Sequence, residues 1–186
     1  DGFTPVFHPT NPNYRIATVQ WASFAYSYDS PTSSNPSWNG MADTDALDRK
    51  GWDAPIMLHP ANPEHIWTGT QRMWKMTGAP SGNWTAMSGD LTLNIDPALS
   101  YRIITSITGS PIDENIVAAG TADGQVHYTE DGGTTWNLMT SGLPERYVTD
   151  LYFDPYNPDS IFCTVSGYRD YAYTPHILKA ELGGPW

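Results

Sequence analysis

Three carboxylates lie close together in the stretch Asp43-Thr44-Asp45-Ala46-Leu47-Asp48. Carboxylate oxygens are ligands that Ca²⁺ prefers, so Asp43, Asp45 and Asp48 form a candidate metal site. The stretch lacks the glycine and the terminal glutamate of a helix-loop-helix calcium loop, and a solvated acidic loop is the alternative. We therefore expect no organic cofactor. Calcium is the one metal ion that we consider for these residues.

Aromatic side chains form a second group of candidates. The segment Tyr168-Arg169-Asp170-Tyr171-Ala172-Tyr173 is too polar and too rich in tyrosine for a simple core strand. Flat aromatic faces stack on sugar rings, and exposed Trp or Tyr often marks a recognition surface. We therefore predict ligand binding by Tyr168, Arg169, Tyr171, Tyr173 and Trp21. Packing between sheets is the alternative role for most of the other aromatic residues.

The histidines and the single cysteine suggest structural roles. His8 and His59 each precede a turn proline at equivalent positions, which predicts that they stabilise the turns. The other three histidines, His65, His127 and His176, lack the spacing of a zinc site. Cys163 lies in an apolar predicted strand, which indicates a buried, inert thiol.

A fourfold internal repeat carries these residues. Its anchoring prolines, Pro9, Pro60, Pro111 and Pro155, are spaced 51, 51 and 44 residues apart. Each repeat contains a first strand, a proline turn, a second strand, a third strand and a corner tryptophan. The corner tryptophans are Trp38, Trp84, Trp136 and Trp186. We predict one domain of four repeats, at approximately 1–50, 51–101, 102–146 and 147–186, the last of them incomplete.

The third corner, Thr129-Glu130-Asp131-Gly132-Gly133-Thr134-Thr135-Trp136, is the most regular of the four. The Asp131 carboxylate can fold back onto backbone N–H groups ahead of it. Gly132 and Gly133 supply positive φ without a steric clash. Thr135 and Trp136 then begin a strand.

This corner resembles the Asp-box, or BNR repeat, of sialidase-like, sortilin-like and xyloglucanase-like β-propellers. The resemblance implies an all-β fold of four-stranded antiparallel blades, with about four blades here as part of a larger propeller. It also implies a secreted protein, extracellular or at the cell surface. In that family the box residues are structural; here they are Thr129, Asp131, Gly133, Thr135 and Trp136. We expect the rest of a longer parent chain, or further copies, to complete the propeller.

The same resemblance indicates what a catalytic site would need. A sialidase-like site uses three converging arginines, and the six arginines here show no matching spacing. A xyloglucanase-like site uses two aspartates facing each other across a cleft. The candidates for such a pair are Asp43, Asp45, Asp48, Asp53, Asp123 and Asp150. Because the spacing does not test that geometry, the sequence favours a non-enzymatic chain without deciding the question.

The net charge of −11 makes nucleic acid and anionic membranes poor partners. No run of about 18 apolar residues is present, so we expect no membrane span. We therefore predict a secreted or surface module that binds glycan or protein through its loops. The alternative is a fragment of a glycoside hydrolase whose acidic cleft is completed by blades outside this chain.

Overall fold

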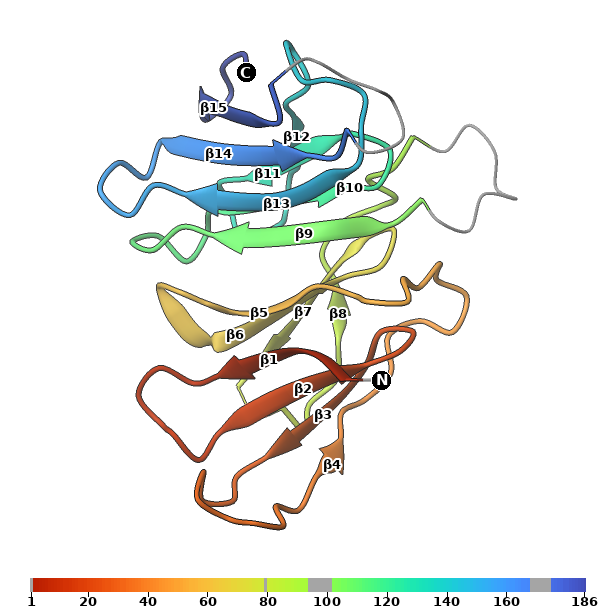
Figure 1. The fold of residues 1–186 in the computed structure, drawn as a ribbon, viewed down its shortest axis with the longest axis vertical. Helices are drawn as coiled ribbons and strands as arrows, with labels where there is room; N and C mark the ends of the chain where they lie inside the picture. Colours follow the sequence, from red (N-terminus) through yellow and green to blue (C-terminus); the bar gives the residue numbers. More distant parts are fainter. Residues whose placement is uncertain (1, 79, 94–101, 168–174) are drawn as a thin grey trace.

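The structure, a computed structural model, describes residues 2–78, 80–93, 102–167 and 175–186 (Figure 1). These residues form antiparallel sheets, and none of them forms a helix that could span a membrane. The prediction of an all-β fold is therefore confirmed. In every sheet the order of the strands in space follows their order in the sequence.

Four sheets follow one another along the chain. The first contains β1 (Gly2–Phe7), β2 (Arg15–Val19), β3 (Ser23–Ser27) and β4 (Asn39–Gly40). The second contains β5 (Ile56–His59), β6 (Asn62–Gly69), β7 (Met73–Thr77) and β8 (Thr85–Ala86). The third contains β9 (Ile104–Gly109), β10 (Val117–Thr121), β11 (Val126–Thr129) and β12 (Asn137–Leu138). The fourth contains β13 (Val148–Phe153), β14 (Ser160–Val165) and β15 (Ile177–Glu181).

Histidine side chains fix two of the proline turns that join first and second strands. The Nδ1 atom of His8 accepts a hydrogen bond from the backbone N–H of Asn11 at 3.1 Å. In the same way, His59 Nδ1 accepts one from the N–H of Ala61 at 3.2 Å. The predicted turn-stabilising role of both histidines is confirmed.

The corner tryptophans join neighbouring sheets. The indole N–H of Trp84 donates to the carbonyl of Ala42 at 2.9 Å, just after the fourth strand of the first sheet. Trp136 donates in the same way to Met87 at 2.9 Å, and Trp186 to Met139 at 2.8 Å. Each bond satisfies a half-buried indole and holds a sheet against the sheet before it.

Close packing between sheets requires glycine at two equivalent positions. A Cβ on Gly69 of β6 would lie 2.6 Å from Ile104 Cγ2, and one on Gly120 of β10 would lie 2.3 Å from Val148 Cγ1. The first strand of the next sheet therefore lies directly against these glycines. Cys163 of β14 is fully buried, and burial raises the pKa of its thiol to about 12, as expected of an inert cysteine.

The corner between β11 and β12 depends on one carboxylate. Asp131 Oδ1 accepts from the backbone N–H groups of Thr134 and Thr135, both at 2.9 Å. Its Oδ2 accepts from Thr135 Oγ1 at 2.7 Å, and Thr129 Oγ1 donates to Oδ1 at 2.8 Å. These bonds lower the pKa of Asp131 to about 2, the backbone bond from Thr135 contributing most.

The corner at Asp29 keeps part of this arrangement, and the corner at Glu181 does not. Asp29 accepts from the backbone N–H of Ser37 across the longer loop that precedes Trp38. Glu181, which stands in the corresponding sequence of the fourth repeat, instead accepts from Ser160 Oγ at 2.8 Å. Its carboxylate therefore binds the neighbouring strand rather than its own corner.

Candidate functional site

The first strands of the four sheets lie beside one another (Figure 1). Residues on and next to these strands line a pocket of about 260 Å³. We call it the inner-strand pocket. Its lining residues include hydroxyl groups from three of these strands and two carboxylates, Asp53 and Asp150, but no Lys, Arg or His. The hydroxyl-bearing residues are Thr4 of β1, Thr105 and Ser106 of β9, and Thr149 of β13. The pocket is therefore polar and negatively charged.

A second pocket, of about 420 Å³, shares Asp53 with the first. We call it the aromatic pocket, because Trp21, Trp52 and Tyr147 line it together with Lys50, Gly51 and Ile103. The three aromatic residues are 56%, 48% and 46% exposed. Large aromatic side chains that remain half exposed and gather around one pocket favour a binding surface over a packing role.

The turn between β2 and β3 presents Trp21 to the aromatic pocket. Trp21 and Ala22 have φ values of 62° and 54°, in the left-handed region that residues other than glycine and asparagine rarely occupy. The backbone N–H of Trp21 donates to the carbonyl of Trp52 at 3.2 Å. Their rings meet edge to face, with centroids 5.1 Å apart. Backbone strain of this kind lowers stability, and it is found most often at functional sites.

Three pocket residues occupy the same position in their repeats. Trp52, Ile103 and Tyr147 each lie eight residues before an anchoring proline, Pro60, Pro111 and Pro155 respectively. All three precede the first strand of their sheet by one to four residues. Because the first strands lie beside one another, this repeat position brings the three side chains to one pocket.

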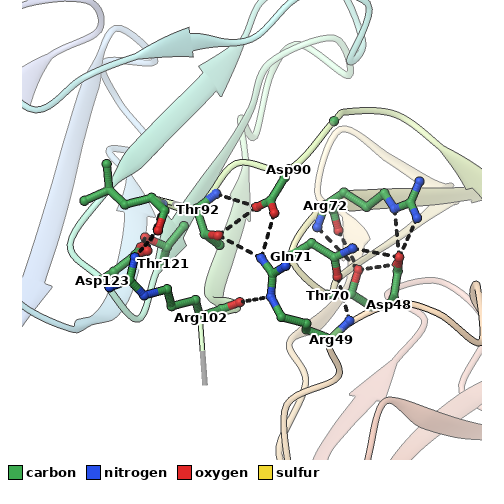
Figure 2. Close-up of polar contacts among 12 residues, drawn as sticks. Asp48, Arg49, Thr70, Gln71, Arg72, Asp90, Thr92, Arg102, Thr121 and Asp123 are labelled. Carbon is green, nitrogen blue, oxygen red and sulfur yellow. Dashed lines mark hydrogen bonds and ion pairs between the residues drawn. The ribbon is translucent and has the colours of Figure 1, made fainter. Parts of the chain in front are cut away.

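The loop that carries Lys50, Gly51, Trp52 and Asp53 is held by Asp48 (Figure 2). Asp48 is 8% exposed. Its Oδ1 accepts from Arg72 Nη2 at 2.6 Å and from Gln71 Nε2 at 2.8 Å. Its Oδ2 accepts from Thr70 Oγ1 at 2.6 Å and from the indole of Trp74 at 2.8 Å. Burial alone would raise the pKa of Asp48, but these hydrogen bonds hold it below its usual value.

Arg49 extends the network toward the third sheet (Figure 2). Its guanidinium donates from Nη2 to Asp90 Oδ2 at 2.7 Å and from Nε to the carbonyl of Arg102 at 3.0 Å. Its backbone N–H donates to Gln71 Oε1 at 2.8 Å. The loop between the first two sheets, which supplies Lys50 to Asp53 to the aromatic pocket, is thus tied to segments that flank the second and third sheets.

Asp53 lies between the two pockets without a direct partner. Within the described part of the chain its carboxylate has no hydrogen bond and no ion pair. Burial raises the pKa of Asp53. Burial also raises the pKa of Tyr147, and the charge on Asp53 adds to that effect. A carboxylate in this position is available to a ligand.

Asp150 and Lys50 complete the charge pattern. Asp150 Oδ1 accepts from Ser106 Oγ at 3.1 Å and from the backbone N–H of Leu151 at 2.9 Å. The second oxygen of Asp150 receives no hydrogen bond from the described residues. The Lys50 ammonium is paired with Asp43 at 2.6 Å, so its charge is compensated within the protein.

The predicted site residues are not all brought together. Trp21 lines the aromatic pocket, whereas Tyr168, Arg169, Tyr171 and Tyr173 lie outside the described residues. The three aspartates of the candidate calcium site bind protein cations instead: Asp43 pairs with Lys50, and Arg72 Nη2 pairs with both Asp45 and Asp48. Among the described residues no group of three potential metal ligands occurs, and calcium binding by these aspartates stays a prediction.

The other charged candidates are separated in the same way. Of the six aspartates considered for a catalytic pair, Asp53 and Asp150 line the inner-strand pocket. Asp123 instead accepts from the backbone N–H of Leu93 at 2.8 Å. Arg15, Arg49 and Arg72 bind the Asp29 carbonyl, Asp90 and Asp48 respectively, so these three guanidinium groups do not converge on one site.

The sequence did not single out Trp52 and Tyr147, which line the aromatic pocket. The signal that identifies them is their common distance from the anchoring prolines, together with their position just before a first strand. Lys50 and Gly51 carried no comparable signal.

No protein-family model matches the chain, and neither does any curated protein. Solved structures do match. An ancestral GH74 enzyme is 16% identical with a TM-score of 0.66, over 97% of this chain and 23% of its own. The GH74 xyloglucanase from Xanthomonas campestris is 15% identical with a TM-score of 0.62, over 94% of this chain and 29% of its own.

YCF48 from Cyanidioschyzon merolae is 12% identical with a TM-score of 0.62, over 98% of this chain and 51% of its own. A structure of YCF48 bound to D1 peptide is also similar, at 14% identity and a TM-score of 0.60. The chain has the β-propeller fold. It spans between about a quarter and about half of the length of these proteins, which include both GH74 enzymes and YCF48. At these identities the similarity establishes the fold and no activity.

Proposed function

We propose that this propeller module binds glycan, and that the aromatic pocket is the binding site. The observation that carries the proposal is the convergence of Trp21, Trp52 and Tyr147, all half exposed, around a pocket of about 420 Å³. Perpendicular indoles offer one face to the apolar side of a sugar ring and one edge to its rim. Asp53 supplies a hydrogen-bond acceptor for sugar hydroxyls beside them.

The strain in the Trp21 turn supports the same proposal. A left-handed conformation at Trp21 costs about 1–2 kcal/mol, and a glycine or asparagine would avoid most of it. Stability alone therefore does not explain a tryptophan at this position. A role in ligand binding does.

A glycan array followed by calorimetric titration tests the proposal. Trp52→Ala should weaken the binding of any oligosaccharide found by about 5-fold, because one ring contact contributes about 1 kcal/mol. Tyr152→Ala is the matched control, since Tyr152 is an exposed aromatic residue of β13 that lines neither pocket. No binding by the wild type, or equal loss in both variants, would contradict the proposal.

The second candidate function is a glycoside hydrolase fragment. It rests on Asp53 and Asp150, which line one pocket and could serve as an acid and a base. A hydrolysis assay on neutral and sialylated oligosaccharides distinguishes the two functions. Turnover that disappears in Asp53→Asn or Asp150→Asn would favour the hydrolase, and binding without turnover would favour the module.

Three further assignments belong to this proposal. The hydrogen bonding of Asp131 supports placing the Thr129–Trp136 corner among the Asp-box repeats. The four repeats, at about 1–50, 51–101, 102–146 and 147–186, are blades of one propeller segment, which further blades or copies complete. An extracellular or cell-surface location accords with a glycan ligand.

A further inference from the structure

From the charges around the two pockets we infer that the preferred glycans carry free amino groups, as glucosamine units do. The inference rests on the proposed glycan binding and names the class of sugar. It draws on one feature that aromatic stacking does not explain, which is the arrangement of charge where the pockets meet.

The inner-strand pocket is lined by two carboxylates without a lining cation. Asp53 has no hydrogen-bonding or ion-pairing partner within the described residues, and Asp150 keeps one oxygen without a donor there. Both aspartates are exposed to solvent at the pocket, and carboxylates without a counter-charge attract a cationic group. The two pocket carboxylates therefore favour a positively charged ligand group, such as an ammonium group.

The neighbouring aromatic pocket imposes a second condition on the ligand. Indole and phenol faces accept the apolar face of a pyranose, and they also attract a cation held above them. The Lys50 ammonium at its edge is already paired with Asp43 at 2.6 Å and leaves no free positive charge to repel a cationic ligand. A sugar ring that bears an ammonium group satisfies both pockets at once.

One sugar can meet both conditions, stacking on the aromatic rings and pairing with a carboxylate, because Asp53 lines both pockets. A ring seated among Trp21, Trp52 and Tyr147 therefore has Asp53 at its border and Asp150 beyond it. The net charge of −11 also favours the approach of a cationic oligosaccharide over a neutral one at low ionic strength.

The test compares two oligosaccharides that differ only in the amino group. Glucosamine hexamer and N-acetylglucosamine hexamer are titrated into the whole chain at about pH 6, where the amines are protonated. We expect the glucosamine hexamer to bind at least about 10-fold more tightly, with a preference that declines as salt is raised. Asp150→Asn should reduce the preference while the N-acetylated hexamer binds as before, because Asp150 does not line the aromatic pocket. Asp53→Asn should weaken the glucosamine hexamer more than the N-acetylated one.

Asp159→Asn is the matched control. It removes the same charge from an exposed aspartate that follows β13 at the end remote from Tyr147, and it should leave the preference unchanged. Circular dichroism of each variant verifies that it is folded.

The possible results distinguish the preference for aminated sugars from glycan binding itself. Equal affinity for the two hexamers overturns the inference and leaves glycan binding intact. Failure of every oligosaccharide to bind overturns the proposed function itself. Binding of a lysine-rich peptide as tight as that of the glucosamine hexamer would show that the pockets select a cation and not an aminated sugar, which also overturns the inference.

Discussion

The indole rings of Trp21 and Trp52 meet at 88° with their centroids 5.1 Å apart, although the two residues precede strands of different sheets. A backbone hydrogen bond of 3.2 Å from Trp21 to Trp52 holds the two segments together. This pair defines one wall of the aromatic pocket. It also requires a left-handed conformation at Trp21, which links the binding surface to a cost in stability.

Trp21→Asn should separate these two roles. Asparagine tolerates positive φ, so relief of about 1 kcal/mol of strain should offset the loss of a ring contact of similar size. We expect a free energy of unfolding within about 1 kcal/mol of the wild type in urea titrations, and roughly 5-fold weaker glycan binding. Trp21→Val is the control, because a β-branched residue is poorly suited to this conformation and should be clearly less stable. Equal stability of the two variants would show that φ at this position carries no cost.

Asp48→Ala should destabilise the protein strongly. The substitution removes the acceptor for four side chains and leaves the Arg72 guanidinium without its shortest ion pair. We expect the free energy of unfolding to fall by about 3 kcal/mol. Asp43→Ala is the comparison, because its pair with Lys50 is exposed and should contribute less than about 1 kcal/mol. A similar, small effect of both substitutions would argue against Asp48 as the residue that fixes the loop.

Asp131→Ala should lower the melting temperature without changing glycan affinity in the folded fraction. The variant loses the acceptor for two backbone N–H groups and two hydroxyl groups at a corner that lines neither pocket. Calorimetry measures the melting temperature, and titration measures the glycan affinity. A normal melting temperature with lost binding would mean that Asp131 has a functional role.

The same carboxylate should contribute to acid sensitivity. The folded pKa of Asp131 is lowered to about 2 from a reference value of 3.8. The unfolded state therefore binds the proton more readily, and the stabilisation is complete above the reference value. It should be lost as pH falls through the interval from 3.8 toward 2. Wild-type melting curves should decline more steeply over this interval than those of Asp131→Ala, and parallel curves would contradict the assignment.

Three buried or half-buried histidines should make the protein sensitive to milder acid. Burial lowers the pKa of His59, His65 and His127 from the reference value of 6.5. Each is neutral in the folded protein, so below that value the unfolded state binds more protons and stability decreases as pH falls. Urea unfolding at several pH values from 7.5 down to 5 should show this loss. NMR titration that places all three pKa values at or above the reference value would contradict it.

The regular features of the fold were predictable because each depends on local sequence. The proline turns need a fixed φ and a nearby acceptor, which His8 and His59 provide within three residues. The Asp131 corner is likewise closed by bonds that reach no more than four residues along the chain. Repetition of such local signals indicated four similar sheets in sequential order.

The sequence alone thus determined the all-β repeat, the turns and the positions of the corner tryptophans along the chain, although the indoles bond to carbonyls 42 to 49 residues away. The tertiary structure decided which side chains meet. Asp48 stood out as a metal candidate by its acidic neighbours, yet its carboxylate is occupied by Arg72 and Trp74, more than twenty residues away. Trp21, Trp52 and Tyr147 share a pocket because the first strands of successive sheets lie side by side. Periodicity assigns a residue its place within a repeat, but the angle and spacing between sheets fix which repeats place their side chains in a common space.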